Sequence, residues 1–291
     1  MEIIHLPALV KEAIKVLNPI PGGTYVDATI GPGGHSEEIL TLIGTGGKLI
    51  GIDRDNEALR TAQERLSDKR VILRKGSFSD MEKLLKKDGI TEVDGILFDL
   101  GISMIQMKNI ERGFSFISDK RMDMRMDKEQ ALSARDVVNK YSANELERIL
   151  REFGEERLSR KISEAIVRKR RIKPIDTCSE LSEIVERVYG RRGRVHPATK
   201  TFQALRIEVN KELDELQKGL DASVRILKRG GRLCVISYHS LEDRIVKHFI
   251  ARSSKEGSLK VITKKPLTPG SEEIRSNPSS RSAKLRAAER I

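Results

Sequence analysis

A glycine-rich turn between a short apolar strand and a helix constrains the fold of this chain more than any other segment. It lies in residues 24–36, whose sequence is TYVDATIGPGGHS. The apolar residues around Val26 suit a buried β-strand. Gly31, Gly33 and Gly34 then allow the backbone to turn with positive φ and to approach a ligand closely. A strand, a glycine turn and a helix in this order predict an α/β unit with a ligand at the turn.

The residues after the turn support a nucleoside ligand. We expect Ser36 to cap a helix that carries the apolar run at residues 39–43. Residues 48–52 form a second predicted strand, which ends in Asp53. A carboxylate roughly 20 residues beyond a glycine turn is placed to accept both hydroxyls of a ribose.

The spacing of the glycines helps to choose between two common ligands, a dinucleotide and S-adenosylmethionine. The dinucleotide pattern Gly-x-Gly-x-x-Gly needs a third glycine, and Ser36 stands in that position. Instead, Asp27 precedes Gly31-x-Gly33, and an acid in this place can hold the ammonium group of a methionine. The pattern therefore favours S-adenosylmethionine over a dinucleotide and over a tight turn without a ligand.

The charge balance indicates a polyanionic partner. The chain has 55 Lys and Arg against 43 Asp and Glu, a net charge of +12. Such an excess favours RNA, DNA or an anionic membrane. No apolar run approaches the roughly 18 residues of a membrane span, so we expect no membrane association. Cys178 and Cys234 make neither a disulfide framework nor a metal pattern, which predicts a cytoplasmic protein without a metal cofactor.

Further apolar segments predict the rest of the sheet. Strands are expected at residues 71–73, 93–98 and 231–237, with a terminal pair at 260–263 and 283–288 and a mobile loop at 266–282. The continuously apolar fourth strand is typical of a parallel sheet covered on both faces. We predict an α/β fold, a Rossmann-like class I S-adenosylmethionine-dependent methyltransferase sheet.

More than a hundred residues separate the fourth and fifth predicted strands, and their apolar residues mostly recur three and four apart. This period predicts helices at 144–153, 157–171 and 178–189, and one long helix over 202–227 that is ended by two glycines. We therefore predict a discontinuous methyltransferase domain of residues 1–105 and 201–291. It is interrupted by an inserted all-helical substrate-recognition domain of residues 106–200.

Two dense runs of basic residues lie in the predicted insert. Charge runs are often only solvated faces, but two of them in a module beside a cofactor site favour contacts with phosphates. The predicted RNA-binding residues are Arg168, Lys169, Arg170, Arg171, Arg191, Arg192 and Arg194.

Polar residues follow the third, fourth and fifth strands. Phe78 can pack on an adenine ring or serve as a core anchor. Asp99 follows the fourth strand, and the candidates after the fifth are Ser237, Tyr238 and His239. Ligands of open α/β sheets lie outside the carboxyl ends of the strands, so we expect Asp99 to be the main catalytic residue.

The residues also bear on which atom is methylated. Attack by a pyrimidine ring carbon needs a cysteine nucleophile, and none stands near Asp99. An exocyclic amine needs acceptors for its N–H groups, and positioning and electrostatics can supply much of the rate. We expect Asp99 to be that acceptor, with weaker roles for Tyr238, Ser237 and His239.

The chain resembles the bacterial RsmH (MraW) family from end to end. The motifs that carry the resemblance are Gly33-Gly34-His35-Ser36, Ile52-Asp53-Arg54-Asp55, Asp99-Leu100-Gly101, Arg112-Gly113-Phe114-Ser115-Phe116, Met122-Asp123-Met124-Arg125-Met126-Asp127, His196-Pro197-Ala198-Thr199 and His239-Ser240-Leu241-Glu242-Asp243-Arg244. The family methylates N4 of a cytidine in the decoding region of 16S ribosomal RNA with S-adenosylmethionine. By resemblance, the donor-binding residues are Gly33, Gly34, His35, Asp53, Phe78, Asp99 and Gln106.

The resemblance implies a cytosine-N4 methyltransferase that acts on 16S ribosomal RNA, within the small ribosomal subunit, with a homodimer as a possible assembly. Two alternatives stay open. A DNA amino-methyltransferase usually carries a Pro-Pro-Tyr or Pro-Pro-Phe motif where this chain has Leu100-Gly101-Ile102. An RNA-binding assembly factor would keep the donor pocket without turnover, which the retained Asp53 and Asp99 disfavour.

Overall fold

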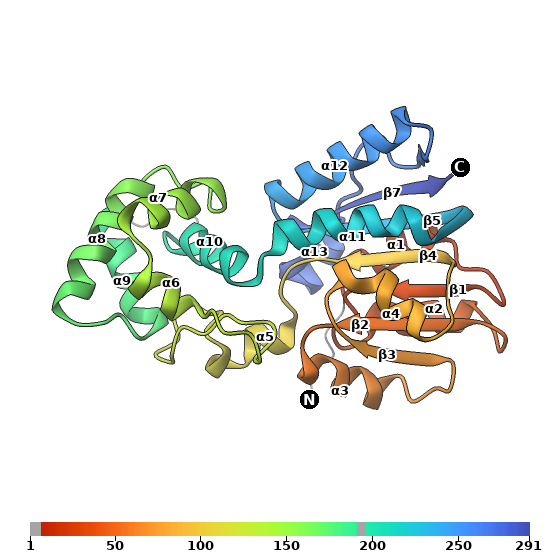
Figure 1. Cartoon of the computed structure of the whole chain (residues 1–291), viewed down its shortest axis with the longest axis horizontal. Coiled ribbons are helices and arrows are strands. Elements are labelled where there is room, and N and C mark those ends of the chain that lie inside the picture. The colour runs from red at the N-terminus through yellow and green to blue at the C-terminus, as the bar shows by residue number, and fades with distance from the viewer. Residues whose placement is uncertain (1–6, 191–195) are drawn as a thin grey trace. The chain divides into compact units, whose positions relative to one another are not determined.

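The computed structural model describes residues 7–190 and 196–291 (Figure 1). The chain divides into two compact units, a sheet unit of Met1–Ser103 with Leu213–Ile291 and a helical unit of Met104–Glu212. The predicted insert begins near the observed boundary but ends too early, at residue 200. That position lies inside a helix that packs on other helices of the insert.

The sheet unit is built on a seven-stranded sheet with the strand order β3-β2-β1-β4-β5-β7-β6. β1 to β5 run parallel, and β7 pairs antiparallel with both β5 and β6. The strands are β1 Thr24–Asp27, β2 Lys48–Asp53, β3 Val71–Lys75, β4 Val93–Asp99, β5 Leu227–Ser237, β6 Leu259–Val261 and β7 Lys284–Arg290. Both the predicted fold class and the terminal strand pair are confirmed.

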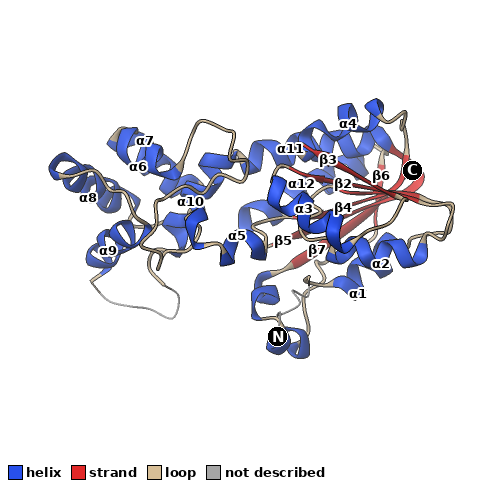
Figure 2. Cartoon of the chain, turned by 90° about the horizontal axis from the view of Figure 1, so that it is seen from below, coloured by secondary structure: helices blue, strands red, loops and turns tan. Residues whose placement is uncertain are grey.

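Helices cover both faces of this sheet. They are α1 Val10–Leu17, α2 Gly34–Leu42, α3 Asn56–Arg65, α4 Met81–Lys87, α11 Glu212–Ile226 and α12 Ser240–Lys255. Alternate strand residues point to opposite faces: Ile96 and Phe98 pack with α4, α11 and α12, while Leu97 packs with α1, α2 and α3. Figure 2 shows the strands between helices such as α4 and α11 on one side and α1 and α2 on the other.

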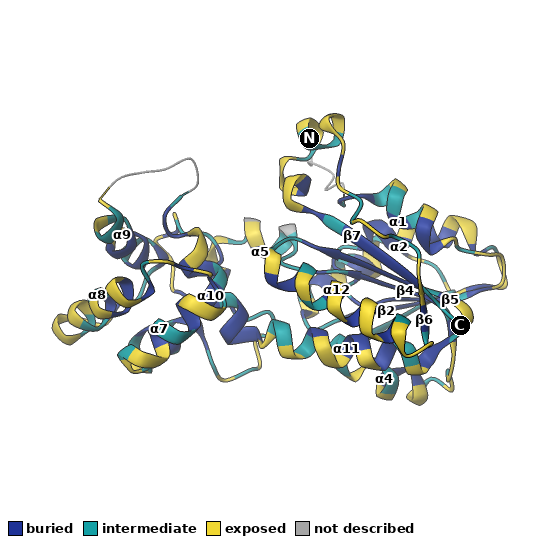
Figure 3. Ribbon diagram, turned by 90° about the horizontal axis from the view of Figure 1, so that it is seen from above, coloured by how far each residue is buried: buried dark blue, intermediate teal, exposed yellow. Residues whose placement is uncertain are grey.

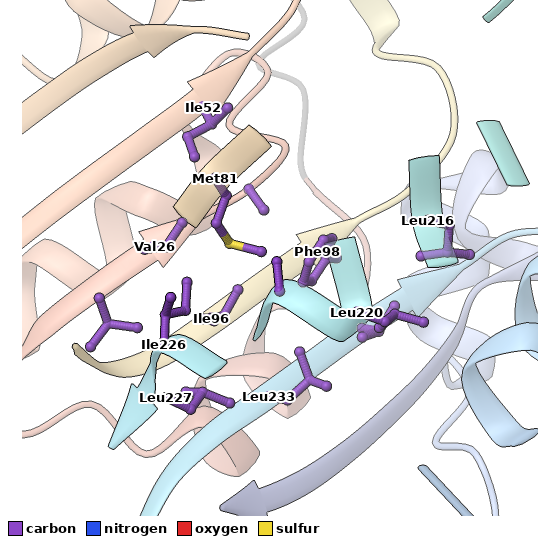
Figure 4. Packing of buried hydrophobic residues seen from close by; sticks show 14 of the residues in the cluster. Val26, Ile52, Met81, Ile96, Phe98, Leu216, Leu220, Ile226, Leu227 and Leu233 are labelled. Atoms are coloured by element: carbon purple, nitrogen blue, oxygen red, sulfur yellow. The ribbon is translucent and has the colours of Figure 1, made fainter. Parts of the chain in front are cut away.

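The hydrophobic cluster between the sheet and α4, α11 and α12 is larger than the one on the opposite face. Val26, Ile52 and Ile96 come from three neighbouring strands, and Leu220 comes from α11 (Figure 4). All four side chains are fully buried. This two-sided burial explains why the parallel strands have continuously apolar sequences.

Two predictions about the return to the sheet are wrong. The single helix expected over residues 202–227 is two helices, α10 Thr199–Asn210 and α11, separated by Lys211 in the left-handed region with a φ of 53°. Gly230 and Gly231 do not end a helix, because they lie within β5.

The prediction of a mobile loop at residues 266–282 is also wrong in part. It contains α13 Ser271–Ser276 and a 3-10 helix at Pro278–Ser282. Glu273 on α13 accepts a hydrogen bond from the Leu9 N–H at 2.8 Å, so this segment is tied to the start of the chain.

The helical unit contains α5 Met104–Lys108, α6 Ala134–Lys140, α7 Ala143–Glu152, α8 Ser159–Ile172, α9 Cys178–Tyr189 and α10. The three predicted insert helices are confirmed within a few residues. α6, α7 and α9 each begin with a capping box, as at Ser142 and Glu145. Within residues 7–190 and 196–291, no helix combines the length and the apolarity that crossing a membrane requires.

Candidate donor and catalytic site

The strand order creates a switch point between β1 and β4. From these neighbouring strands the chain continues outward in opposite directions, to β2 on one side and β5 on the other. Ligands of open α/β sheets bind at such a point, outside the carboxyl ends of the strands. Asp27, Asp99 and Asp53 are the last residues of β1, β4 and β2. The sheet therefore brings the three predicted acids to one edge.

The glycine turn is shaped as predicted, but its helix cap is different. Gly33 has a φ of 85° and occupies the N-cap position of α2. A Cβ on Gly33 would lie 2.9 Å from Leu66 Cδ1, so both the conformation and the space require glycine. Ser36, the predicted cap, lies inside α2, where its hydroxyl donates to Asp27 Oδ2 at 2.7 Å. Asp27 thus links the end of β1 to the helix.

Asp53 is fixed against the same turn. The Gly31 N–H donates to Asp53 Oδ2 at 3.0 Å, and the Asp55 N–H donates to Oδ1 at 2.9 Å. Asp53 remains only half-buried. Each carboxylate oxygen has a further lone pair, so Asp53 can still accept hydrogen bonds from ribose hydroxyls.

Asp99 is the centre of a polar network. The Tyr238 hydroxyl donates to Asp99 Oδ1 at 2.8 Å. The backbone N–H of Asp99 donates to Thr29 Oγ1 at 2.6 Å. His35 Nε2 lies 3.0 Å from the Ala8 carbonyl oxygen, and its Nδ1 lies 3.6 Å from Asp99 Oδ2. The Asp99 side chain keeps 21% exposure, so a ligand can reach the carboxylate.

Burial shifts the protonation of this site toward neutral forms. It raises the pKa of Asp99 to about 7, although the Tyr238 hydrogen bond opposes the shift. It raises the pKa of Asp27 and of Asp53 to about 6. It also lowers the pKa of His35. A cation bound among these acids would favour their charged forms and reverse the shifts.

Two predicted catalytic residues have structural partners. The Ser237 hydroxyl donates to the Lys284 carbonyl at 3.3 Å. His239 is the N-cap of α12, and its ring nitrogen Nδ1 accepts from the Glu242 N–H at 3.4 Å. α12 therefore begins at Ser240, directly after the His239 cap. Of the three residues predicted beside Asp99, only Tyr238 is seen in direct contact with it.

Phe78 packs against α11. Its ring packs edge-to-face on Phe98, with 5.5 Å between the centroids. A Cβ on Gly219 would lie 2.8 Å from Phe78 Cδ2, so the ring occupies the space that glycine leaves. Phe78 therefore acts as a core anchor, one of its two predicted roles, and remains half-exposed for the other.

Glu215 was not predicted, yet it organises the loop after β3. Its carboxylate accepts hydrogen bonds from the hydroxyls of Ser77 and Ser79, and Arg54 Nη2 donates to it at 3.3 Å. Glu215 lies one turn before Gly219 on α11. Its hydroxyl partners are 138 and 136 residues away in sequence, so no local pattern reveals the cluster.

The remaining predicted residues lie in the helical unit or outside the described residues. Gln106 is buried on α5. Arg170 donates to the carbonyls of Val138 and Tyr141 at 2.7 and 2.6 Å, so it closes the end of α6 and its guanidinium is not a free surface group. Arg168, Lys169 and Arg171 are exposed on α8. Arg191, Arg192 and Arg194 fall outside the described residues.

The residues at the sheet edge suit S-adenosylmethionine. Asp99 is the acid whose partly exposed carboxylate suits an ammonium or sulfonium group, and Asp53 keeps acceptor capacity for a ribose. Asp27 is buried and accepts hydrogen bonds from Ser36 and the Thr29 N–H, so in this structure it supports the turn. Gly31 leaves the backbone of the turn open to close approach, because a Cβ there would meet no atom closer than 3.9 Å, and Phe78 offers a half-exposed ring after β3. Those residues would hold the methionine, ribose and adenine portions of this donor.

Comparisons with known proteins identify the family of this chain. The model of the MraW methylase family matches residues 2–291. "Ribosomal RNA small subunit methyltransferase H" of Persephonella marina is 50% identical over 292 residues, covering 99% of both chains. The protein of that name from Caldicellulosiruptor bescii is 49% identical over 304 residues, again covering 99% of each.

Solved structures show a more distant likeness. An rRNA methylase from Streptococcus thermophilus has a TM-score of 0.45 at 12% identity, covering 97% of this chain and 93% of that one. A fibrillarin from Aeropyrum pernix with bound S-adenosyl-L-methionine has a TM-score of 0.40 at 12% identity, covering 96% and 73%. At these scores the solved structures add nothing to the assignment. The match over residues 2–291 and the close relatives are sufficient, and the chain belongs to the MraW methylase family.

Proposed function

We propose that this protein uses S-adenosylmethionine to methylate the exocyclic N4 amine of a cytidine in the decoding region of 16S ribosomal RNA. The family and the names of its close relatives support a small-subunit ribosomal RNA substrate. The choice of an amine depends on one observation, the reachable Asp99 carboxylate that Tyr238 holds at the end of β4.

Asp99 suits a reaction in which an amine loses a proton. S-adenosylmethionine supplies an electrophilic methyl group, which the amine nitrogen attacks as the bond from carbon to sulfur breaks. Asp99 would accept an N–H hydrogen bond, orient the nitrogen lone pair and take the released proton. Burial brings the pKa of Asp99 to about 7 without a ligand, and a bound donor cation would lower it, so the carboxylate is charged and able to accept a proton near neutral pH.

The cysteines support nitrogen rather than ring-carbon methylation. Cys234 is buried inside β5, and burial raises its pKa far above the usual range. Cys178 is buried in the helical unit, and burial raises its pKa to about 12. A thiolate nucleophile of the kind that ring-carbon methylation needs is disfavoured at both positions.

Exposed cations on α8 support a role for the helical unit in binding RNA. Arg168, Lys169 and Arg171 lie near the end of the helix, and none of the ion pairs observed among the described residues involves them. Arg160 is instead paired with Glu164 on the same helix. The cations near the helix end are therefore available for phosphates.

Transfer of labelled methyl groups tests this proposal. We expect label from S-adenosylmethionine to enter small ribosomal subunits that lack this modification, and digestion of their RNA should yield N4-methylcytidine. Label in 5-methylcytidine would overturn the choice of an amine. Label in duplex DNA alone would favour a DNA amino-methyltransferase. RNA binding without transfer would favour an assembly factor.

A further inference from the structure

The exposed residues within α12 of the sheet unit carry positive charge and include no acid. The exposed residues of this helix recur about once per helical turn. The exposed residues of α12 after its first position are Arg244, Lys247, His248, Ala251, Arg252 and Lys255 (Figure 3). No exposed residue within α12 is acidic, whereas solvated faces usually mix both signs. α9 shows that mixture, since its exposed Arg187 pairs with the exposed Glu183.

The contacts of the exposed face of α12 leave its charge accessible. A hollow of about 390 Å³ is lined by His248, Ala251, Arg252, Lys255 and the following Glu256. Arg252 lies 3.1 Å from Asp221 and 4.0 Å from Glu256, but all three side chains are more than half exposed, and such surface pairs are weak. Asp243 does not offset the face, because its carboxylate is bound by Arg286 at 2.6 Å.

The face starts close to the catalytic edge. α12 begins at Ser240, two residues after Tyr238, whose hydroxyl binds Asp99. The helix then runs away from this edge, with Lys247 about 10 Å and Lys255 about 22 Å along it from Ser240. A strand of nucleic acid whose base enters the site would have to extend along the helix over this length to meet these cations.

We propose that the exposed face of α12, centred on Lys247, Arg252 and Lys255, is a second RNA-binding surface that contacts the phosphate backbone of the substrate. This inference rests on the proposed function for the identity of the RNA. It adds a contact surface on the sheet unit itself, separate in sequence from the basic runs of the insert. The chemistry recognised is the repeated charge of phosphates, without selection among bases.

The salt dependence of binding tests this surface. The probe is a labelled transcript of 16S ribosomal RNA, with Kd measured by anisotropy over a range of KCl concentrations. The variant K247Q/R252Q/K255Q removes three cations and should reduce the slope of log Kd against log salt by about 2. All three positions are exposed, and thermal melting checks that the variant is folded.

A matched variant controls for total charge. K11Q/K15Q/K48Q removes the same charge from exposed positions on α1 and at the start of β2. We expect it to keep the wild-type slope. An equal fall in both variants, or no fall for the α12 variant, would overturn the proposal.

Two further outcomes separate this inference from the proposed function. If the α12 variant binds the transcript like wild type but binds small subunits poorly, the face contacts a ribosomal protein and the RNA proposal is wrong. If the wild-type protein transfers no methyl group but the α12 variant still shows the reduced slope, the surface stands and the proposed reaction fails.

Discussion

The hydroxyl of Tyr238 and the carboxylate of Asp99 join the ends of β5 and β4 through one hydrogen bond of 2.8 Å. Tyr238 follows the last residue of β5, and Asp99 is the last residue of β4, so pairing of the two strands fixes the contact. The bond stabilises the charged form of a carboxyl whose pKa burial otherwise raises. Tyr238 thereby sets the pH at which Asp99 can accept a proton.

Tyr238→Phe should move the pH dependence of turnover. Loss of a hydrogen bond to a charged group, worth about 1.5–3 kcal/mol, should raise the pKa of Asp99 by about one unit or more. The acidic limb of the profile of kcat against pH should shift upward, while donor affinity changes little. An unshifted limb would show that Asp99 is not the titrating group.

Ionisation of Asp99 should destabilise the protein. The pKa rises from 3.8 to about 7 on folding, so the folded state binds more protons between these values. The free energy of unfolding therefore contains a contribution that falls as pH rises through this window and is constant above it. Asp99→Asn removes this contribution, so the Tm of the variant minus that of wild type should be larger at pH 8 than at pH 5. An equal difference at both pH values would contradict the shift.

Substitution of Asp53 and of Asp99 should affect different steps. Asp53→Ala removes the predicted ribose acceptor and should weaken binding of S-adenosylmethionine about 10- to 100-fold. Asp99→Ala should lower turnover more than donor affinity. Titration calorimetry gives both affinities. An intact affinity in Asp53→Ala would remove Asp53 from the donor site.

Gly219→Ala should displace Phe78. The new Cβ would lie 2.8 Å from the ring, and overpacking of this kind costs about 1–3 kcal/mol. We expect the KM for the donor to rise about tenfold with little change in kcat. Phe78→Leu in the same chain relieves the clash, so the double variant should lose less affinity than the two single changes together. Strict additivity would show that Gly219 does not act through Phe78.

Two variants of α8 should separate stability from RNA binding. They are Arg170→Gln and the triple variant R168Q/K169Q/R171Q. Arg170 binds two carbonyls at the end of α6, so its loss should lower the free energy of unfolding by about 1–3 kcal/mol and leave the salt slope unchanged. The triple change should flatten the salt slope with little effect on Tm. Melting curves and anisotropy distinguish the two. Equal salt slopes in both variants would remove α8 from the RNA contact.

The sequence predicts those parts of the site whose residues are close along the chain. Gly33 and Asp27 lie in one turn, and Asp53 ends the next strand, so their chemistry follows from local spacing. The predicted cap at Ser36 is wrong because a serine hydroxyl can either cap a helix or donate to a nearby acid, as Ser36 does to Asp27. A sequence pattern does not distinguish these alternatives.

Other features depend on contacts that sequence patterns do not report. Lys211 adopts a φ of 53° between two helices with matching apolar periods, and nothing in its residue type signals that break. Glu215 joins a loop more than a hundred residues away. Arg170 resembles its basic neighbours in sequence and differs only because the carbonyl of Val138 lies within its reach.

The helical unit lies in the sequence between Asp99 and Leu227, whose strands are neighbours in the sheet. Joining those strands in a nascent chain requires closure of a very long loop. If the insert folds first, the effective loop shortens, and a tenfold shortening lowers the entropic cost by about 2 kcal/mol. Substitutions in the core of the insert, such as at Ile149, would therefore slow assembly of a sheet to which they contribute no residue.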